Sequence, residues 1–271
     1  MTETVRYALF GNPVSQSLSP AMHAAAYARM GIAADYRAFR VDRAAEVVRL
    51  IRDEGIAGAS VTIPFKESVM ELLDEIDPAA AAIGAVNTIV NRNGRLSGCN
   101  TDAPGFLRDL GEWMAVPARV FVVLGAGGAA RAALYALREA GGTPICVNRT
   151  PARAQELARS LGCRWEPAAA LAGLRADCLI NTTPRGMHPE TGQTPVEARL
   201  LARFPRVMDM IYNPPLTRLL REARAAGCAV RSGIGMLVHQ GAEQIRLWTG
   251  QEPPVEEMRR VVLERLTDSD G

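Results

Sequence analysis

The sequence predicts an α/β protein built from two α/β domains with a cleft between them. Strand-like and helix-like segments alternate from end to end, which is typical of parallel sheets covered by helices on both faces. The 271 residues are enough for two medium-sized domains. A glycine-rich turn in the middle of the chain, between a buried apolar run and a helical run, marks the start of a second βα series.

The first series is predicted from periodicity and from turn residues. Strands are expected at 5–11, 35–41 and 58–63, and helices at 20–31, 42–54, 65–76 and 103–114. Pro20 in the first turn and Gly31 at the end bound the first of these helices. The stretch 85–102 reads as a hairpin, because Asn93-Gly94 is a preferred two-residue turn.

The second series begins with a strand, a glycine-rich turn and a helix in residues 118–142. Further strands are expected at 144–150, 177–184 and 206–212, and further helices at 151–162, 215–226, 235–248 and 254–266. We therefore predict a substrate-binding catalytic domain at 1–102 plus 236–271 and a nucleotide-binding domain at 103–235. The last residues, TDSDG, are expected to fray.

Composition argues against several classes of protein. The formal net charge of +2 and the absence of like-charge blocks argue against nucleic-acid binding, and no apolar run is long enough to span a membrane. The N-terminus leads directly into a strand without a secretion signal. Five scattered cysteines without a CxxC motif predict free thiols in a cytoplasmic protein, and three widely separated histidines predict no metal site.

The glycine-rich turn has the pattern of a dinucleotide site. Gly125, Gly127 and Ala130 fit G-x-G-x-x-G/A directly after a strand and at the start of a helix, as in a Rossmann-type domain. The first glycine permits a tight turn, and the second lets a pyrophosphate approach the backbone at the positive end of the helix. A glycine turn that binds no ligand is the alternative.

The end of the next strand indicates which dinucleotide is bound. An NAD site usually carries an acidic residue there for the ribose 2′-hydroxyl, whereas this strand continues as VNRTPAR without a carboxylate. Asn148, Arg149, Thr150 and Arg153 instead suit a 2′-phosphate, which predicts NADP. The alternative is that Thr150 caps the following helix and the arginines are merely solvated.

Three serines stand at the first strand-to-helix turn, in GNPVSQSLSP. Ser19 precedes Pro20 and is a natural helix N-cap. A helix N-terminus with hydroxyls beside it also suits a carboxylate ligand. We expect Ser17 and Ser19 to bind a carboxylate, with Ser19 also available for capping, and Ser15 to be structural.

A lysine and an aspartate provide a candidate acid–base pair. Lys66, in SVTIPFKE, is expected in the first turn of helix 65–76, where the positive end of the helix dipole disfavours a cation. Asp102, in NTDAPGF, is expected at the start of helix 103–114, where it can cap the helix and also hydrogen-bond the lysine. Such a pair can exchange a proton with an alcohol or a ketone. A solvated lysine and a purely capping aspartate are the alternatives.

At this point the chain resembles the shikimate dehydrogenases, cytoplasmic NADPH-dependent enzymes that interconvert 3-dehydroshikimate and shikimate. The resemblance covers nearly the whole length. Its motifs occur in the family's order: GNPVSQSLSP, SVTIPFKE, GAVNT, NTDAPGF, GAGGAARA, NRTPARA, NTTPRGM, DMIYNPPLT and GIGMLVHQGA.

The resemblance implies a role for each matching residue. For the substrate they are Ser17 and Ser19 at the carboxylate, Thr62, Asn87, Asp102 and Gln240 at the ring hydroxyls, Tyr212 near the substrate, and Lys66 as the catalytic residue paired with Asp102. For NADP they are Gly125, Ala126, Gly127, Gly128, Ala129, Asn148, Arg149, Thr150 and Arg153, with Met210 and Gly233 beside the nicotinamide. Gln240 as an ordinary polar helix residue and Asn87 as a turn residue are the alternatives.

Three positions depart from the family pattern: Ser60 and Cys99, where the family often has Asn and Asp, and Pro184 in NTTP, where many members have Ser. The first two reduce the polar groups near the substrate, so substrate affinity is expected to differ. Two other functions stay open: a quinate/shikimate dehydrogenase of relaxed cofactor use, and a non-catalytic regulator that binds the same ligands. Small molecules are the expected partners, with neither nucleic acid nor membrane, in a monomer or a homodimer.

Overall fold

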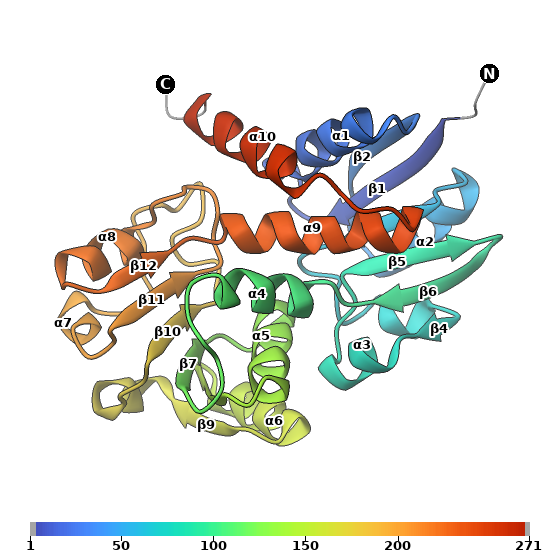
Figure 1. The fold of residues 1–271 in the computed structure, drawn as a ribbon. Helices are drawn as coiled ribbons and strands as arrows, with labels where there is room; N and C mark the ends of the chain where they lie inside the picture. The colour runs from blue at the N-terminus through green and yellow to red at the C-terminus, as the bar shows by residue number, and fades with distance from the viewer. Residues whose placement is uncertain (1–3, 269–271) are drawn as a thin grey trace. The chain divides into compact units, whose positions relative to one another are not determined.

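The computed structural model describes residues 4–268, which form two compact units, each with its own six-stranded sheet (Figure 1). One unit comprises the residues up to Gly105 and those from Val238 onward, and the other comprises Phe106–Leu237. The chain passes between the units within α4 (Asp102–Gly111) and within α9 (Ile234–Thr249). The boundaries expected from the sequence, at 102/103 and 235/236, fall in the same two helices.

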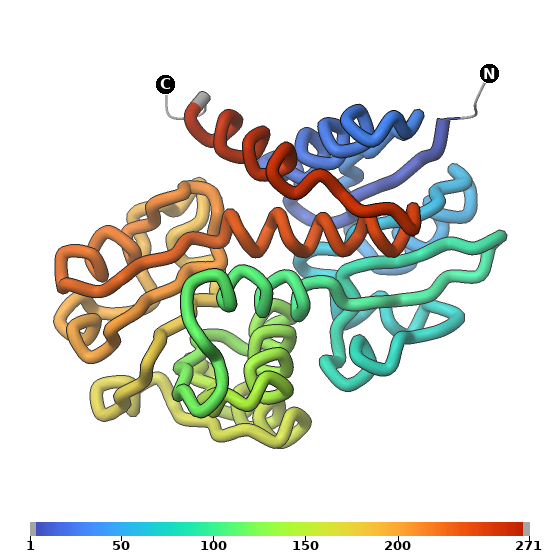
Figure 2. The backbone as a smooth tube through the Cα atoms, in the orientation of Figure 1, coloured from blue at the N-terminus to red at the C-terminus, as the bar shows by residue number. Residues whose placement is uncertain are grey.

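The first unit has a mixed sheet in the order β2-β1-β3-β5-β6-β4. Its strands are β1 (Val5–Gly11), β2 (Ala34–Arg40), β3 (Gly58–Val61), β4 (Glu75–Ile76), β5 (Thr88–Arg92) and β6 (Arg95–Cys99). Its other helices are α1 (Ser19–Met30), α2 (Ala44–Asp53), α3 (Pro78–Ile83) and α10 (Val255–Asp268). The C-terminal α10 lies beside α1, so the two ends of this unit are packed together (Figure 2).

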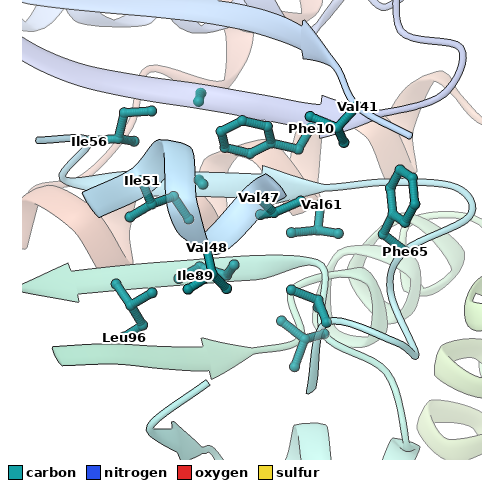
Figure 3. Close-up of a cluster of buried hydrophobic side chains, with 14 of the residues drawn as sticks. Phe10, Val41, Val47, Val48, Ile51, Ile56, Val61, Phe65, Ile89 and Leu96 are labelled. Atoms are coloured by element: carbon teal, nitrogen blue, oxygen red, sulfur yellow. The ribbon is translucent and has the colours of Figure 1, made fainter. Parts of the chain in front are cut away.

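One face of this sheet is apolar and is covered by α2. Side chains alternate along a strand, so Phe10 of β1 and Val61 of β3 lie on this face, together with Ile89 and Leu96 of the hairpin (Figure 3). Ile51 of α2 packs against them and is fully buried. This cluster is the core beneath the loops that follow β1 and β3.

The opposite face carries aromatic and polar side chains. Tyr7 of β1 stacks on Tyr27 of α1 and on Trp248 of α9, with ring centroids 5.1 and 5.0 Å apart. A side chain at Gly58 of β3 would overlap the Trp248 indole, so α9 packs directly on the backbone of this strand. The next residue on this face of β3 is Ser60, whose hydroxyl faces α9.

The hairpin predicted at 85–102 is confirmed, whereas the helix predicted at 65–76 is wrong. Asn93 and Gly94 both have positive φ, 55° and 89°, as a two-residue hairpin turn requires. Residues 65–74 instead form turns and one short 3₁₀ segment, Met70–Leu72, followed by β4. Tertiary bonds take the backbone groups that a helix would use: Lys66 O accepts from Val86 N, and Asp74 N donates to Leu96 O.

The second unit has an all-parallel sheet in the order β12-β11-β10-β7-β8-β9. Its strands are β7 (Val120–Leu124), β8 (Thr143–Asn148), β9 (Arg164–Pro167), β10 (Cys178–Asn181), β11 (Arg206–Asp209) and β12 (Ala229–Arg231). Its other helices are α5 (Gly128–Glu139), α6 (Pro151–Leu161), α7 (Ala198–Leu201) and α8 (Arg218–Ala225). Counted from β7, this is the strand order of the Rossmann fold, so the predicted fold class is confirmed.

The elements that the sequence did not predict are short: α3, α7, β4, β9 and β12 have two to six residues each. Within residues 4–268, no helix is both long enough and apolar enough to cross a bilayer. Of the residues expected to fray, Thr267 and Asp268 end α10, and the other three lie outside the described residues.

Candidate functional site

Four segments of the first unit meet at one edge of its sheet. β1 and β3 are parallel and end at this edge, while β5 runs antiparallel to β3 and to β6 and therefore begins there. The segments after β1, β3 and β6 and the residue before β5 are thus neighbours, although they lie up to 90 positions apart in sequence. A side chain at Gly11 would overlap Thr62, which shows how closely the first two segments approach.

Lys66 and Asp102 form an ion pair at this edge. Lys66 Nζ donates to Asp102 Oδ2 at 2.5 Å, and the two side chains are 15% and 6% exposed. The pairing expected from the sequence is therefore present. The reason given for the pairing, that Lys66 lies in the first turn of a helix, is wrong, because Lys66 lies in a turn between strands. The position of the lysine comes from the β3 loop, and the helix dipole has no part in it.

The other carboxylate oxygen of Asp102 is held from β5. Asn87 Nδ2 donates to Asp102 Oδ1 at 2.9 Å, and Asn87 Oδ1 accepts from the backbone N of Thr101 at 2.7 Å. The alternative, that Asp102 only caps its helix, is wrong. Asn100 caps α4 by accepting from Ala103 N, so both oxygens of Asp102 face side chains.

The serine turn is arranged differently from the expected cap. Ser19 is the first residue of α1, and Leu18 occupies the N-cap position without a side-chain bond, so the prediction that Ser19 caps the helix is wrong. Ser17 Oγ instead accepts from Ser19 N at 3.2 Å. Ser15 is exposed, whereas Ser19 is buried. Ser19 is 7% exposed, and its hydroxyl makes no capping bond.

A buried histidine lies beneath this turn. His23 Nδ1 bonds the backbone carbonyl of Ser19 at 2.9 Å, and the ring stacks on Tyr36 with centroids 4.1 Å apart. Burial lowers the pKa of His23 to about 4, although the bond to Ser19 acts in the opposite direction. The imidazole is therefore neutral near pH 7 and donates its Nδ1 proton to Ser19.

Gln240 lies next to the start of α4. It is buried on α9, and an added Cβ at Gly105 would lie 2.6 Å from Gln240 N. Gly105 stands one helical turn after Asp102. Because Gly105 has no side chain, the backbone of Gln240 can lie close to the N-terminal end of α4, which carries Asp102. Seven of the predicted substrate residues thus belong to the first unit: Ser17, Ser19, Thr62, Lys66, Asn87, Asp102 and Gln240.

The glycine-rich turn of the second unit has the conformation expected of a phosphate loop. Gly125 has φ of +122°, and a side chain there would overlap Thr182 Oγ1, which itself donates to Leu124 O. Gly127 is the N-cap of α5, and an added Cβ there would have no atom within 4 Å. The turn is thus packed on one side and open at the helix N-terminus, next to Gly128 and Ala129.

The Asn148 loop lies beside this turn, because β7 and β8 are parallel neighbours. Asn148 Nδ2 donates to Thr150 O at 3.1 Å and closes the loop. Thr150 occupies the N-cap of α6, but its hydroxyl makes no capping bond. Arg149 and Arg153 are exposed and form no ion pair with any described residue. Two cations are thus available to an anionic ligand.

The ends of β10 and β11 complete this edge. Gly233 N donates to Ile211 O, and a side chain at Gly233 would overlap Met210 O, so the two residues expected beside the nicotinamide are adjacent. Tyr212 follows on the same strand end, in the second unit. Its expected place near the substrate stays a prediction.

Asp209, which the sequence reasoning did not identify, orders these strand ends. It accepts bonds from Asn181 Nδ2, Ile211 N and Thr217 Oγ1. Burial raises its pKa to about 6 against the effect of these three donors. Asp209 and Thr217 stand at the two ends of the motif DMIYNPPLT, and Asn181 opens NTTPRGM, but the motifs alone do not show that these side chains bond one another.

One signal for Lys66 was also missed. Lys66 is the only lysine in the sequence, and arginine fills every other such position. Arginine keeps its charge at all working pH values, whereas an amine can both give and accept a proton. A lone lysine in an arginine-rich chain therefore indicates a position where proton exchange matters. Among the described residues, no three His, Cys, Asp or Glu side chains are grouped so as to hold a metal ion.

Comparison with known proteins identifies the family of the chain. The family model of the shikimate dehydrogenase substrate binding domain matches residues 9–89, and that of the shikimate 5'-dehydrogenase C-terminal domain matches residues 233–263. The shikimate dehydrogenase (NADP(+)) of Moorella thermoacetica is 47% identical over 279 residues, which is 97% of this chain and 94% of that protein.

Two solved structures are similar over nearly the whole chain. The enzyme of Thermus thermophilus, in complex with NADP(H) and shikimate, is 40% identical with a TM-score of 0.87, and the match covers 96% of this chain and 99% of that one. The enzyme of Listeria monocytogenes, in complex with shikimate and NAD, is 32% identical with a TM-score of 0.85, and the match covers 97% of each chain.

Proposed function

Because the chain belongs to the shikimate dehydrogenase family, we propose that it catalyses the reversible, NADPH-dependent reduction of 3-dehydroshikimate to shikimate. The family predicted from the nine motifs is thereby confirmed. The observation that carries the proposal is the Lys66–Asp102 pair at the strand edge, with Asn87 on the second carboxylate oxygen. This arrangement suits an enzyme that exchanges one proton with a ring oxygen.

The second unit fits NADP. The open face of Gly127 leaves room for a pyrophosphate at the N-terminus of α5, and Ala126 to Ala129 present backbone N–H groups there, whereas Gly125 N donates to Val147 O. Arg149 and Arg153, with Asn148 and Thr150, suit the 2′-phosphate. Met210 and Gly233 stand at the next strand ends, where the nicotinamide is expected. When bound, NADPH supplies the hydride and NADP⁺ accepts it.

Lys66 provides the proton. In the direction of reduction, its ammonium donates a proton from Nζ to the ketone oxygen, which becomes the hydroxyl of the product. In the reverse direction, the neutral amine takes the hydroxyl proton. Asp102 stays ionised throughout and fixes the position of Nζ through Oδ2, while Asn87 fixes the carboxylate through Oδ1. The remaining binding energy comes from groups away from the reacting oxygen.

Those groups suit a small polyhydroxylated carboxylate. Ser17 and Ser19 are proposed to bind the carboxylate, and Thr62, Asn87 and Gln240 the ring hydroxyls, with Tyr212 as a further neighbour. The proposal is supported by the first unit, where every one of these residues except Tyr212 lies at or next to the same strand edge.

A quinate/shikimate dehydrogenase of relaxed cofactor use is the second candidate. The Listeria monocytogenes relative was solved with NAD, so the fold accepts either dinucleotide. Arg149 and Arg153 favour NADP in this chain. A non-catalytic regulator is disfavoured because the Lys66–Asp102 pair is intact.

The decisive experiment is the absorbance of NADPH formed by the purified protein from NADP⁺ and shikimate. Parallel assays with quinate and with NAD⁺ rank the candidates. The proposal predicts the highest kcat/KM with shikimate and NADP⁺. No turnover with any of the four pairs contradicts enzymatic function, and preference for quinate or NAD⁺ favours the second candidate.

The proposed enzyme acts in the cytoplasm on small molecules, as a monomer or a homodimer. All five cysteines are free thiols, which supports a reducing compartment. Cell fractionation tests the compartment, and sedimentation of the purified protein distinguishes one copy from two.

A further inference from the structure

A glutamine behind the site connects α9 to two strands of the sheet. Gln244 stands one helical turn after Gln240 on α9 and is 1% exposed. Its Oε1 accepts from Ser60 Oγ at 2.9 Å, and its Nε2 donates to Thr88 Oγ1 at 3.1 Å. Neither partner hydrogen-bonds Lys66 or Asp102. Gln244 is thus separated from the ion pair by two further links.

The side-chain amides of Gln244 and Asn87 each have one possible orientation, because each faces a group that can only donate or only accept a hydrogen bond. Gln244 Nε2 also faces the backbone carbonyl of Asn87 at 3.4 Å, and a carbonyl can only accept. Asn87 Oδ1 faces the backbone N of Thr101, which can only donate, and Asn87 Nδ2 faces the Asp102 carboxylate. The direction of each hydrogen bond follows from these constraints.

The bonds therefore run one way. Ser60 gives its proton to Gln244, so the Tyr36 hydroxyl, 2.7 Å from Ser60 Oγ, is the donor to Ser60. Thr88 receives from Gln244 and donates to Asn87 Oδ1, either directly at 2.9 Å or through Thr101 Oγ1 at 3.0 Å. Asn87 then donates to Asp102. From Tyr36 to Asn87 each link presents its donor toward the carboxylate, and Asn87 Nδ2 donates both to Asp102 Oδ1 and to Thr101 Oγ1.

In such a series, each hydrogen bond polarises the next one in the direction of the Asp102 carboxylate. Hydrogen bonds in series strengthen one another in a buried setting, and the last donor then faces a fixed negative charge. Among the described residues, Lys66 is the charged group bonded to that carboxylate from the opposite side. His23 stacks on Tyr36 and also faces the side chain of Gln244. Burial keeps its pKa at about 4, so it is neutral near pH 7 and adds no second charge to this series of bonds.

We propose that Gln244 is a positioning residue for the Lys66–Asp102 pair, acting as the central link of a one-way hydrogen-bond relay from Tyr36 to Asp102. The inference rests on the proposed dehydrogenase function. It also gives Ser60 a role: where the family often has Asn, this chain has a hydroxyl that bonds Gln244 instead of a longer group at the substrate. Loss of Gln244 lets Asn87 and the carboxylate rotate, and the proton at Lys66 Nζ is then misplaced.

Gln244→Met tests this, because methionine keeps the length of the side chain but cannot link Ser60 to Thr88. The expected result is a fall in kcat of about 5- to 20-fold, equivalent to one or two hydrogen bonds, with KM for shikimate and for NADP⁺ changed less than about twofold. Ser60→Ala removes the preceding link and is expected to lower kcat less. Gln251→Met, at an exposed site after α9, is the matched control and is expected to keep the wild-type kcat.

A spectroscopic measurement separates positioning from packing. Lys66 is the only lysine, so lysine labelled with ¹³C at Cε gives a single side-chain signal without assignment. The signal is expected to move in Gln244→Met and in Ser60→Ala but not in Gln251→Met. An unchanged kcat, or a raised KM at unchanged kcat, overturns the inference, as does an unmoved signal. A wild-type protein that does not oxidise shikimate overturns the proposed function instead, and the lysine signal still tests the relay.

Discussion

The two units place their predicted site residues at equivalent sheet edges but hold them in different ways. In the first unit the groups are side chains that bond one another: Lys66 to Asp102, and Asp102 to Asn87. In the second unit the equivalent edge offers backbone at Gly127 and leaves the Arg149 guanidinium exposed. At the edge in the first unit, the functional side chains are already hydrogen-bonded to one another. At the edge in the second unit, the backbone and the arginines are exposed and can bind an anion.

The difference follows from what each ligand needs. A proton has to be transferred at one defined atom, so the first edge must fix Nζ to within a fraction of an ångström. A pyrophosphate and a 2′-phosphate carry their own charge and need only donors and cations within reach. Substitutions in the first unit should therefore act on kcat, and those in the second on the KM for the dinucleotide.

The largest effect is expected at Lys66. Both Lys66→Ala and Lys66→Arg should lower kcat by about 10²- to 10⁴-fold, the range of general acid–base catalysis, with KM for shikimate changed much less. Arginine keeps the charge beside Asp102 but cannot deliver a proton. Steady-state assays of both variants test this. Near-normal turnover in Lys66→Arg contradicts proton transfer by the lysine, because charge alone would then suffice.

The next largest effect is expected at Arg149. Arg149→Asp replaces a cation at the proposed 2′-phosphate site with an anion, so KM for NADPH should rise by roughly 10- to 100-fold, as expected for a lost charged hydrogen bond and added repulsion. KM for NADH, which lacks that phosphate, should change far less. Arg159→Asp, at an exposed position later on α6, is the control. Equal changes for the two dinucleotides contradict the assignment.

The sequence predicted the local turns of the site correctly, but it did not predict most of the long-range contacts that hold the site residues. The glycine turn and Asn93-Gly94 are local signals, because φ and turn type depend on adjacent residues. Lys66 and Asp102 were identified correctly as a pair but for a wrong reason, since helix 65–76 is replaced by turns and β4. Gln244 was missed because Ser60 and Thr88 lie far away in sequence, and no short pattern records such contacts. Asp209 was missed although Ile211 and Thr217 are close in sequence, because its bond to Asn181 of β10 joins two different strands.

Substitutions at two glycines of the second unit should distinguish an effect on stability from an effect on NADPH binding. Gly125→Ala should lower the unfolding free energy by roughly 1–3 kcal/mol, because φ is +122° and Thr182 occupies the space of the new methyl group. Gly127→Ala has φ of −101° and open space, so it should fold normally yet raise KM for NADPH about tenfold. Chemical denaturation and kinetics of both variants test this. A Gly127→Ala protein with wild-type KM contradicts a close phosphate approach.

The smallest effect concerns pH and has opposite signs in the two units. His23 has a pKa of about 4 in the folded state against 6.5 for an ordinary histidine, so its contribution to stability is present above pH 6.5 and is lost as pH falls toward 4. Asp209 has a pKa of about 6 against 3.8, so its contribution is present below pH 3.8 and is lost as pH rises through 6. Acidification from pH 6.5 to 4 thus weakens the first unit and strengthens the second.

Two variants expose these opposite trends. His23→Phe keeps a ring against Tyr36 without a titrating group, and Asp209→Asn keeps the shape of the carboxylate without its charge. Unfolding free energies measured between pH 4 and 7 should fall less steeply on acidification in His23→Phe than in the wild-type protein, and more steeply in Asp209→Asn. The differences should be on the order of 1–3 kcal/mol across the window. Parallel curves for the two variants would show that the two buried groups titrate as they do in an unfolded chain. The contrast between the units would then be confined to their ligand-facing edges, because their interiors would respond alike to pH.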